Sequence, residues 1–247
     1  MRWTLLASAI ALSVIYCCAP ASAQSTQPTT GSVDTSLPRP DVPLPPGMTP
    51  IFDGKTLNGW VQVPDNSWTV QDGILASRGV GRGVLYTANE YSRYRVIFDI
   101  RHVSGKPDHQ ACVLFFGTTP AAGEKPQDAL GAVQFQVPPG YTWDYRKGHN
   151  NAGKGEFKSL KHPKYDAKQW SRVELLIDAT KGTARMAVAQ PPGSAATEVV
   201  DFDVADAGKT GPFALQMHNK GLFDQYANIA VEINPAKDDL VTIKTQP

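Results

Sequence analysis

The chain has 247 residues, of which 41% are hydrophobic and 19% are charged, and its formal net charge is +1. This near-neutral balance argues against nucleic acids and anionic membranes as partners, because both bind proteins mainly through an excess of Lys and Arg. The sequence shows no internal repeat.

Residues 1–23 are typical of a secretory signal peptide. Arg2 supplies the positive start, residues 5–18 form an apolar run, and Ala-Ser-Ala at 21–23 is a small-residue cleavage site. No later apolar run reaches the roughly 18 residues that a membrane-spanning helix needs. We therefore expect an exported protein, periplasmic or extracellular, without a transmembrane segment.

The cysteines agree with this interpretation. A lipoprotein signal is the weaker alternative, because Tyr16 precedes Cys17 and Cys17 precedes Cys18, where a small residue would be wanted. Cleavage leaves Cys112 alone, so no disulfide within the chain is expected. A single hydrophobic core must then stabilise the domain, and about 190 ordered residues suffice for one.

The chain divides into four parts by composition. After the signal peptide, residues 24–48 are rich in Pro, Ser and Thr and predict a disordered linker. Residues 49–235 form the folded domain. Residues 236–247 are a peripheral tail, in which Leu240, Val241 and Ile243 could dock as a short strand.

The folded domain has the pattern of an all-β protein. Period-two and short apolar runs recur along it, and a brief helix is expected only at 88–91. Residues 68–70 and 74–76 form the clearest hairpin, because Asp72-Gly73 favours a tight turn. Ten or more short strands predict two packed antiparallel sheets, a jelly-roll sandwich. The other strands are expected at 83–87, 94–102, 111–116, 132–137, 172–178, 184–190, 198–204, 213–219 and 228–233.

Two of these strands offer polar side chains on one face. Gln134 and Gln136 alternate with apolar residues, and Gln216 and His218 alternate in the same way before a turn that begins at Asn219. Amides both donate and accept hydrogen bonds, so paired amides suit sugar hydroxyls. Together the two strands would line a concave sheet face. The alternative is the exposed polar face of an antiparallel sheet.

A long irregular segment, residues 138–168, lies between two of the expected strands. Loops of this length are uncommon unless they have a function. Aromatic rings stack on sugar rings while charged neighbours bind hydroxyls, so the composition suits the rim of a carbohydrate site. The alternative is a loop anchored by its aromatics. The residues concerned are Tyr141, Trp143, Asp144, Tyr145, Arg146, Lys147 and His149.

Other catalytic motifs are absent from the sequence. The five histidines are scattered without metal-ligand spacing, and no nucleophile elbow, phosphate loop or dinucleotide fingerprint occurs. A glycosidase needs two carboxylates across a cleft, and only Asp144, Glu156 and Asp224 fall near the segments described above. No cofactor is predicted with certainty, although a divalent metal remains an alternative.

Five segments form a further pattern: IFDGKTLNGW at 51–60, W-x-V-x-D-G at 68–73, Gln-x-Gln at 134–136, QWSRV at 169–173 and GPFALQMHNKG at 211–221. In order and spacing they resemble the 3-keto-disaccharide hydrolase-like domain, over residues 49–234. The resemblance implies a concanavalin-like jelly roll in a secreted bacterial protein. It also implies lyase, hydratase or hydrolase action on 3-keto-glycosides.

This chemistry needs a base, because a ketone at C3 acidifies the C2 proton and allows elimination of the C1 substituent. The resemblance makes His218 the first candidate for base, with Asp144 and His149 as acid or orienting groups. The candidate substrate-binding residues are Gln134, Gln136, Trp143, Tyr145, Arg146, Gln216, Asn219 and Asp224.

The chain departs from the family pattern at three places. Family members commonly carry Asn-Ser-Gly…Arg where this chain has 111–117, a Glu at the position of Gln134, and Phe-Arg-Asn-Ile where it has 226–229. Each change removes a polar or charged candidate. The chain is therefore expected to be a divergent member, and a non-catalytic glycan-binding module of the cell envelope is the alternative function.

Overall fold

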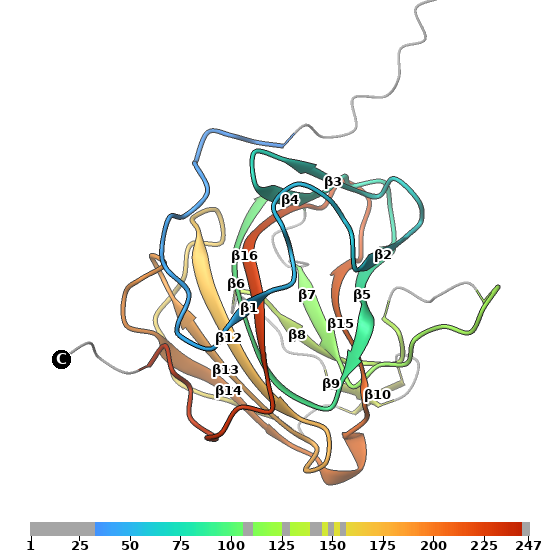
Figure 1. Ribbon diagram of the computed structural model, residues 1–247, viewed down its shortest axis with the longest axis vertical. Coiled ribbons are helices and arrows are strands. Elements are labelled where there is room, and N and C mark those ends of the chain that lie inside the picture. Colours follow the sequence, from blue (N-terminus) through green and yellow to red (C-terminus); the bar gives the residue numbers. More distant parts are fainter. Residues whose placement is uncertain are drawn as a thin grey trace, which may run out of the picture.

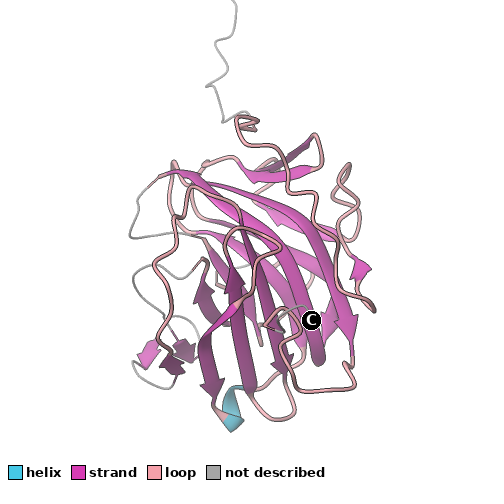
Figure 2. Cartoon of the chain, turned by 90° about the vertical axis from the view of Figure 1, so that its left-hand side faces the viewer, coloured by secondary structure: helices cyan, strands magenta, loops and turns pink. Residues whose placement is uncertain are grey.

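The computed structural model describes residues 33–105, 111–124, 129–138, 145–147, 151–153 and 157–243. They form an all-β jelly-roll sandwich of a nine-stranded and a five-stranded antiparallel sheet, as the sequence predicted (Figure 1). In the described part of the chain the one helical element is a 3-10 turn at Ala205–Ala207 (Figure 2).

The two sheets take their strands from distant parts of the chain. In spatial order the larger sheet contains β11 (Phe157–Ser159), β14 (Thr197–Asp203), β13 (Thr183–Ala189), β12 (Ser171–Asp178), β6 (Arg93–Ser104), β16 (Phe223–Ile233), β4 (Ile74–Ser77) and β3 (Trp68–Gln71), with β1 (Thr49–Pro50) paired to β16. The smaller sheet contains β2 (Trp60–Val63), β5 (Gly83–Tyr91), β15 (Gly211–Met217), β7 (Cys112–Phe115) and β8 (Val133–Gln136). A separate pair consists of β9 (Tyr145–Lys147) and β10 (Asn151–Gly153).

The core lies between the sheets because alternate residues of each strand point inward. On β6 the inward series includes Val96, Phe98 and Ile100, and on β15 it includes Phe213 and Leu215, all fully buried. The rings of Phe98 and Phe213 join the two sheets with centroids 6.0 Å apart. Each fully buried side chain of this size contributes roughly 1.5–3 kcal/mol, so this layer dominates the stability of the fold.

The local turn signals are partly confirmed. Asp72 and Gly73 have φ values of 53° and 76° and join β3 to β4, as the hairpin prediction required. The helix expected at 88–91 is wrong, because β5 continues to Tyr91 and pairs there with Gly211 of β15. A four-residue helix cannot offset the cost of its nucleation, whereas sheet pairing adds hydrogen bonds to a neighbouring strand.

The segment before β1 lies along the outer face of the nine-stranded sheet (Figure 1). We call residues 33–48 the N-terminal strap. Arg101 Nη2 donates to the backbone oxygen of Asp34 at 2.5 Å, and Arg172 donates to the backbone oxygens of Val42 and Pro43 at 2.9 and 2.8 Å. A disordered linker is therefore the wrong description from residue 33 onward. Arginines of the sheet bind backbone carbonyls of the strap, an interaction that composition does not reveal.

A buried ion pair lies beneath the strap. Asp99 on β6 is fully buried and accepts hydrogen bonds from Arg172 Nε at 2.8 Å and Nη2 at 2.9 Å. Asn228 Nδ2 donates to the same carboxylate at 2.6 Å. A buried carboxylate needs such partners, because an uncompensated charge in the interior is strongly unfavourable.

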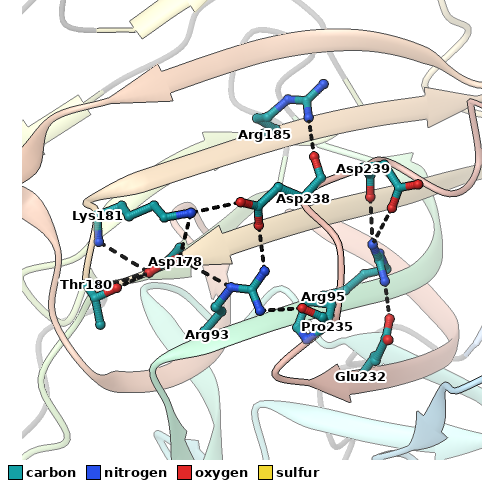
Figure 3. Close-up of polar contacts among 10 residues, drawn as sticks. All are labelled: Arg93, Arg95, Asp178, Thr180, Lys181, Arg185, Glu232, Pro235, Asp238 and Asp239. Atoms are coloured by element: carbon teal, nitrogen blue, oxygen red, sulfur yellow. Dashed lines mark hydrogen bonds and ion pairs between the residues drawn. The ribbon is translucent and has the colours of Figure 1, made fainter.

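The segment after β16 covers the adjoining part of this face (Figure 3). We call residues 234–243 the C-terminal clasp. Asp238 accepts hydrogen bonds from Arg93 at 2.6 Å and from Lys181 at 2.8 Å, and Arg95 Nη2 donates to the backbone oxygen of Asp239 at 2.6 Å. Leu240 is buried, so the described part of the tail, residues 236–243, docks on the sheet, but the short strand expected there does not form within these residues.

Replacing Arg172 by Met is expected to lower the free energy of unfolding by about 3–5 kcal/mol, because Asp99 would remain buried without its cation. Urea denaturation of the purified protein measures this loss. The control is Arg39→Ala, which removes an exposed arginine that donates to Asn228 at 2.9 Å. Arg39→Ala should lower the free energy of unfolding by less than about 1 kcal/mol. Equal losses for the two variants would contradict a special contribution of the buried Asp99–Arg172 pair.

The ion pairs of Asp238 in the C-terminal clasp predict that the stability of the protein depends on pH. Hydrogen bonds from Lys181 and Arg93 lower the pKa of Asp238 from 3.8 to about 2. A lowered folded-state pKa contributes stability that is complete above the ordinary pKa and is lost as the pH falls toward the folded value. The stability gap between wild type and Asp238→Asn should therefore shrink between about pH 5 and pH 2 in urea titrations. A gap that widens toward low pH would contradict the clasp.

Candidate functional site

Three of the sequence-predicted binding residues meet on the five-stranded sheet. Gln216 on β15 pairs with Cys112 on β7, and Cys112 pairs with Gln136 on β8. The next row contains Ala214, Leu114 and Gln134 in the same strand order. Directly paired residues share a face, so the amides of Gln134, Gln136 and Gln216, which we call the amide cluster, lie on one side of the sheet.

This side is the outer face of the sheet. The alternating neighbours Val113, Phe135 and Leu215 belong to the core between the sheets, so the amides point the opposite way. Gln134, Gln136 and Gln216 nevertheless have exposed fractions of only 6%, 4% and 2%. The amide cluster is thus shielded from bulk water, where hydrogen bonds to a ligand compete less with solvent.

His218 lies at the open end of the amide cluster. It follows the last residue of β15, is half-buried, and by alternation continues the face of Gln216. Met217 pairs with Gly83, the first residue of β5, and the exposed Arg82 precedes Gly83 in the chain. Arg82 was missed in the sequence, because the pairing of Gly83 with Met217 depends on the register of β5 with β15.

The loop that carries His218 is held at both ends. Gly221 N donates to the backbone oxygen of Gly79 at 2.9 Å, and Ser77 Oγ donates to that of Leu222 at 3.0 Å. Asn219 is half-buried, and its Nδ2 atom is buried without a partner among the described residues. The loop that carries His218 and Asn219 therefore has a backbone fixed at both ends.

Asp224, also predicted to bind substrate, lies elsewhere. It is on β16 of the nine-stranded sheet, is 1% exposed, and its Oδ1 lies 2.8 Å from Nδ1 of His102 on β6. Burial raises the pKa of the Asp224 carboxyl, and the hydrogen bond from His102 opposes this shift. Burial and the nearby Asp224 carboxylate also raise the pKa of Tyr226. The pair is an interior polar contact of the larger sheet and does not belong to the amide cluster.

The inward direction of the His102 side chain can be predicted from the sequence by extending one pattern. Tyr94, Val96, Phe98 and Ile100 are the inward residues of β6, and His102 follows them at the same spacing. A histidine that continues a core-facing series needs a buried partner. The identity of that partner depends on the pairing of Asp224 with His102 between β16 and β6, which only the fold reveals.

The remaining candidates come from the long segment after β8. Trp143, Asp144 and His149 lie outside the residues that the structure describes. The backbones of Tyr145 and Arg146 belong to β9, pair with Gly153 and Ala152 of β10, and lie beside β8. The segment thus returns to the strand that carries Gln134 and Gln136.

The described ranges contain neither a metal-ligand cluster nor a membrane-spanning helix. No group of three or more His, Cys, Asp or Glu residues there could hold a metal ion. Within the same ranges, none of the helical structure has the length and apolarity needed to span a bilayer.

Two cavities open on the nine-stranded side. One of about 340 Å³ lies between strap and clasp and includes Arg172 and Thr242 in its lining. The other, of about 160 Å³, lies beside Phe223 and Asp224, but the free Oδ2 atom of Asp224 is buried out of contact with solvent. Neither is lined by the amide cluster, so we place the candidate site by the convergence of polar side chains.

The buried contact between Asp224 and His102 predicts different outcomes for two variants of Asp224. Asp224→Ala leaves His102 without its partner and should lower the free energy of unfolding by about 1–3 kcal/mol. Asp224→Asn keeps a hydrogen-bonding oxygen and removes a carboxylate whose ionisation the folded state disfavours. Because a raised folded-state pKa makes ionisation cost stability, wild type should lose stability relative to Asp224→Asn as the pH rises above about 4. A relative gain by wild type in urea titrations would contradict this account.

The fold of this chain is similar to that of other solved structures. No curated protein matches the chain. A solved structure described as a putative glycosyl hydrolase from Parabacteroides distasonis is 14% identical, with a TM-score of 0.53 over 76% of this chain and 94% of that chain. Lectin I-B4 from Griffonia simplicifolia is 10% identical, with a TM-score of 0.51 over 74% of this chain and 97% of that chain. At these identities both show likeness of fold alone.

The match to a protein family is more extensive. The model of the 3-keto-alpha-glucoside-1,2-lyase-like domain matches residues 47–232. This range includes all the strands that carry the amide cluster and His218. The chain therefore belongs to the 3-keto-alpha-glucoside-1,2-lyase-like domain family.

Proposed function

We propose that the protein is an exported enzyme that cleaves 3-keto-glycosides by elimination followed by hydration. The observation that carries the proposal is the convergence of Gln136, Gln216 and His218 on one end of a sheet face, in a chain of this family. Export rests on residues 1–23, which have the pattern of a signal peptide and lie outside the described residues. The site of action would then be the periplasm or the extracellular space.

The reaction can be assigned to groups at this end of the sheet. His218 takes the C2 proton, and the electrons of the C–H bond form an enolate with the C3 ketone. The C1–O bond then breaks and the departing oxygen receives a proton, which leaves a double bond between C1 and C2. Water adds across that bond to give the free 3-keto sugar.

The enolate needs positive charge or hydrogen-bond donors near the C3 oxygen. The guanidinium of Arg82, which precedes the Gly83–Met217 pair, is the candidate for this role. Gln136 and Gln216 would bind sugar hydroxyls, with Asn219 beside the base. Asp144 and His149 remain the candidate acid or orienting groups, and they lie outside the described residues.

A second function is favoured by the neutrality of the two central rows of the outer face. Across β2, β5, β15, β7 and β8, the row through Gln216 and the row through Ala214 contain no carboxylate. Neutral amides bind sugars without supplying acid or base. A glycan-binding module that performs no reaction is therefore the competing proposal.

Incubation with methyl 3-keto-glucoside and with methyl glucoside tests the enzyme proposal. We expect methanol release from the keto sugar only, because only the ketone acidifies C2. His218→Ala should lower kcat by about 10²–10⁴-fold, the usual contribution of a general base. The matched control is His162→Ala, whose ring lies against the backbone oxygen of Pro163 and which should keep full activity.

Calorimetric titration with the same sugars separates the two proposals. Saturable binding without turnover would establish the binding module and reject the enzyme. Full activity in His218→Ala would remove that histidine as the base. The absence of both binding and turnover would contradict the two proposals together.

A further inference from the structure

The cavity of about 340 Å³ on the nine-stranded side is built from segments that are distant in the chain. Val42 of the strap, Val241 of the clasp and Ala195 of the connection between β13 and β14 contribute three walls. Arg172 of β12 and Ala189 of β13, which pair directly, also line it. We call this space the strap–clasp cavity. It lies on the outer face of one sheet, whereas the amide cluster lies on the outer face of the other.

The three walls are tied to one another and to the sheet. A Cβ atom added at Gly193 would lie 3.3 Å from Cγ1 of Val42, so the strap and the connection are in contact. Ala196 N donates to the backbone oxygen of Thr242 at 3.2 Å, which joins the connection to the clasp. Thr242 N and Oγ1 donate to Oε2 of Glu174 on β12 at 2.8 and 2.6 Å. The strap–clasp cavity is therefore preformed, as ligand sites usually are.

Arg172 supplies this cavity with a hydrogen-bond donor. A guanidinium has five N–H groups, and two of those of Arg172 bind Asp99. One more on Nη2 binds the backbone oxygen of Val42, and one on Nη1 binds that of Pro43. The second N–H of Nη1 has no acceptor among the described residues. Val42 and Pro43 line the cavity themselves, so the end of the guanidinium lies at its wall.

The burial of Arg172 makes this unmet donor informative. The side chain is 4% exposed, and a buried donor without an acceptor costs about 1–3 kcal/mol. A ligand oxygen in the strap–clasp cavity would supply the missing acceptor. The cavity and the donor are separate observations that point to the same place.

The lining of the cavity excludes strongly charged ligands. Arg172 is the one ionisable residue in this lining, and Asp99 neutralises it through hydrogen bonds of 2.8 and 2.9 Å. The neighbouring Glu174 is fully buried and is bound by Arg95 and by the clasp. A cation would therefore find no carboxylate in the lining, and an anion would meet a guanidinium that is already paired.

The remaining walls combine apolar groups with a hydroxyl oxygen. Val42, Pro45, Ala189 and Val241 present C–H groups. Ser194 Oγ donates to the backbone oxygen of Pro191 at 2.7 Å, so its oxygen is left to accept a hydrogen bond. A purely apolar ligand would leave this oxygen and the Arg172 donor unmet. The matching ligand is compact and uncharged, with hydroxyl groups at its edge and C–H groups on its faces, which is the chemistry of a sugar ring.

We propose that the strap–clasp cavity is a second carbohydrate site, which binds one uncharged sugar residue. An oxygen of the sugar accepts from Arg172, a hydroxyl donates to Ser194, and the ring lies against the apolar walls. Binding there requires neither His218 nor the amide cluster, so it is independent of the proposed reaction. It would hold the protein on a glycan while the opposite face binds a glycoside.

NMR titration of the full chain with methyl glucoside tests the location of this site. We expect saturable shifts of the backbone amides of Ala195, Val241 and Thr242, in wild type and equally in His218→Ala. Ala195→Trp fills the cavity from its exposed wall and should raise the Kd at least about tenfold. The matched control is Ala205→Trp, because Ala205 is also exposed and lies beyond the other end of β14. This control should bind as wild type does.

Charged sugars test the chemistry of the site. Glucuronate and glucosamine should bind the strap–clasp cavity at least about fivefold more weakly than methyl glucoside, because the lining offers neither charge a free partner. Equal or tighter binding of either charged sugar would overturn the assignment of an uncharged ligand.

The remaining outcomes separate this proposal from the proposed function. Shifts confined to the amide cluster would overturn the second site and leave the proposed function standing. Shifts at the cavity in a protein that cleaves no 3-keto-glycoside would support the second site and reject the enzyme. No shift anywhere, or cavity shifts that Ala195→Trp leaves unchanged, would overturn the second site. If circular dichroism shows that Ala195→Trp does not fold, Ala195→Phe takes its place, and the shifts in wild type decide the location in either case.

Discussion

The packing of two sheets through their inward-facing aromatic side chains is the interaction on which the rest of the structure depends. Phe98 and Phe213 meet across the core, and Phe135 lies with its centroid 6.1 Å from that of Phe202. Strand alternation that turns these residues inward also turns Gln134, Gln136 and Gln216 outward. The amide cluster is thus a direct consequence of the pattern that builds the core.

The two outer faces of the sandwich are used differently. On the nine-stranded sheet, charged residues such as Asp99 and Arg172 are buried beneath the strap. Arginine side chains bind backbone carbonyls there, so this face stabilises the terminal segments. On the five-stranded sheet the outer face carries neutral amides next to apolar side chains. A neutral polar face beside an apolar one matches a sugar ring, which is polar at its edges and apolar on its faces.

Strand alternation predicts much of the fold and part of the site. It places Gln216 and His218 on one face of their strand and Gln134 and Gln136 on one face of theirs. That the two faces join depends on β7, which pairs with both β15 and β8. Strand alternation cannot show that Asp224 lies in the other sheet against His102, because that contact depends on the pairing of β16 with β6. The docking of the strap cannot be predicted for a similar reason, since Arg101 and Arg172, which bind its backbone, are far away in the sequence. Long-range pairing is what single-sequence patterns lack.

The proposed binding of a sugar by the amide cluster is the contact on which the assigned roles of the other side chains depend. The most direct measurement follows the side-chain amide resonances of the glutamines by NMR during titration with methyl 3-keto-glucoside. We expect saturable shifts for Gln134, Gln136 and Gln216, and none for Gln225, which bonds to Arg101 in the other sheet. Shifts at Gln225 without shifts in the amide cluster would contradict the proposed binding of a sugar there.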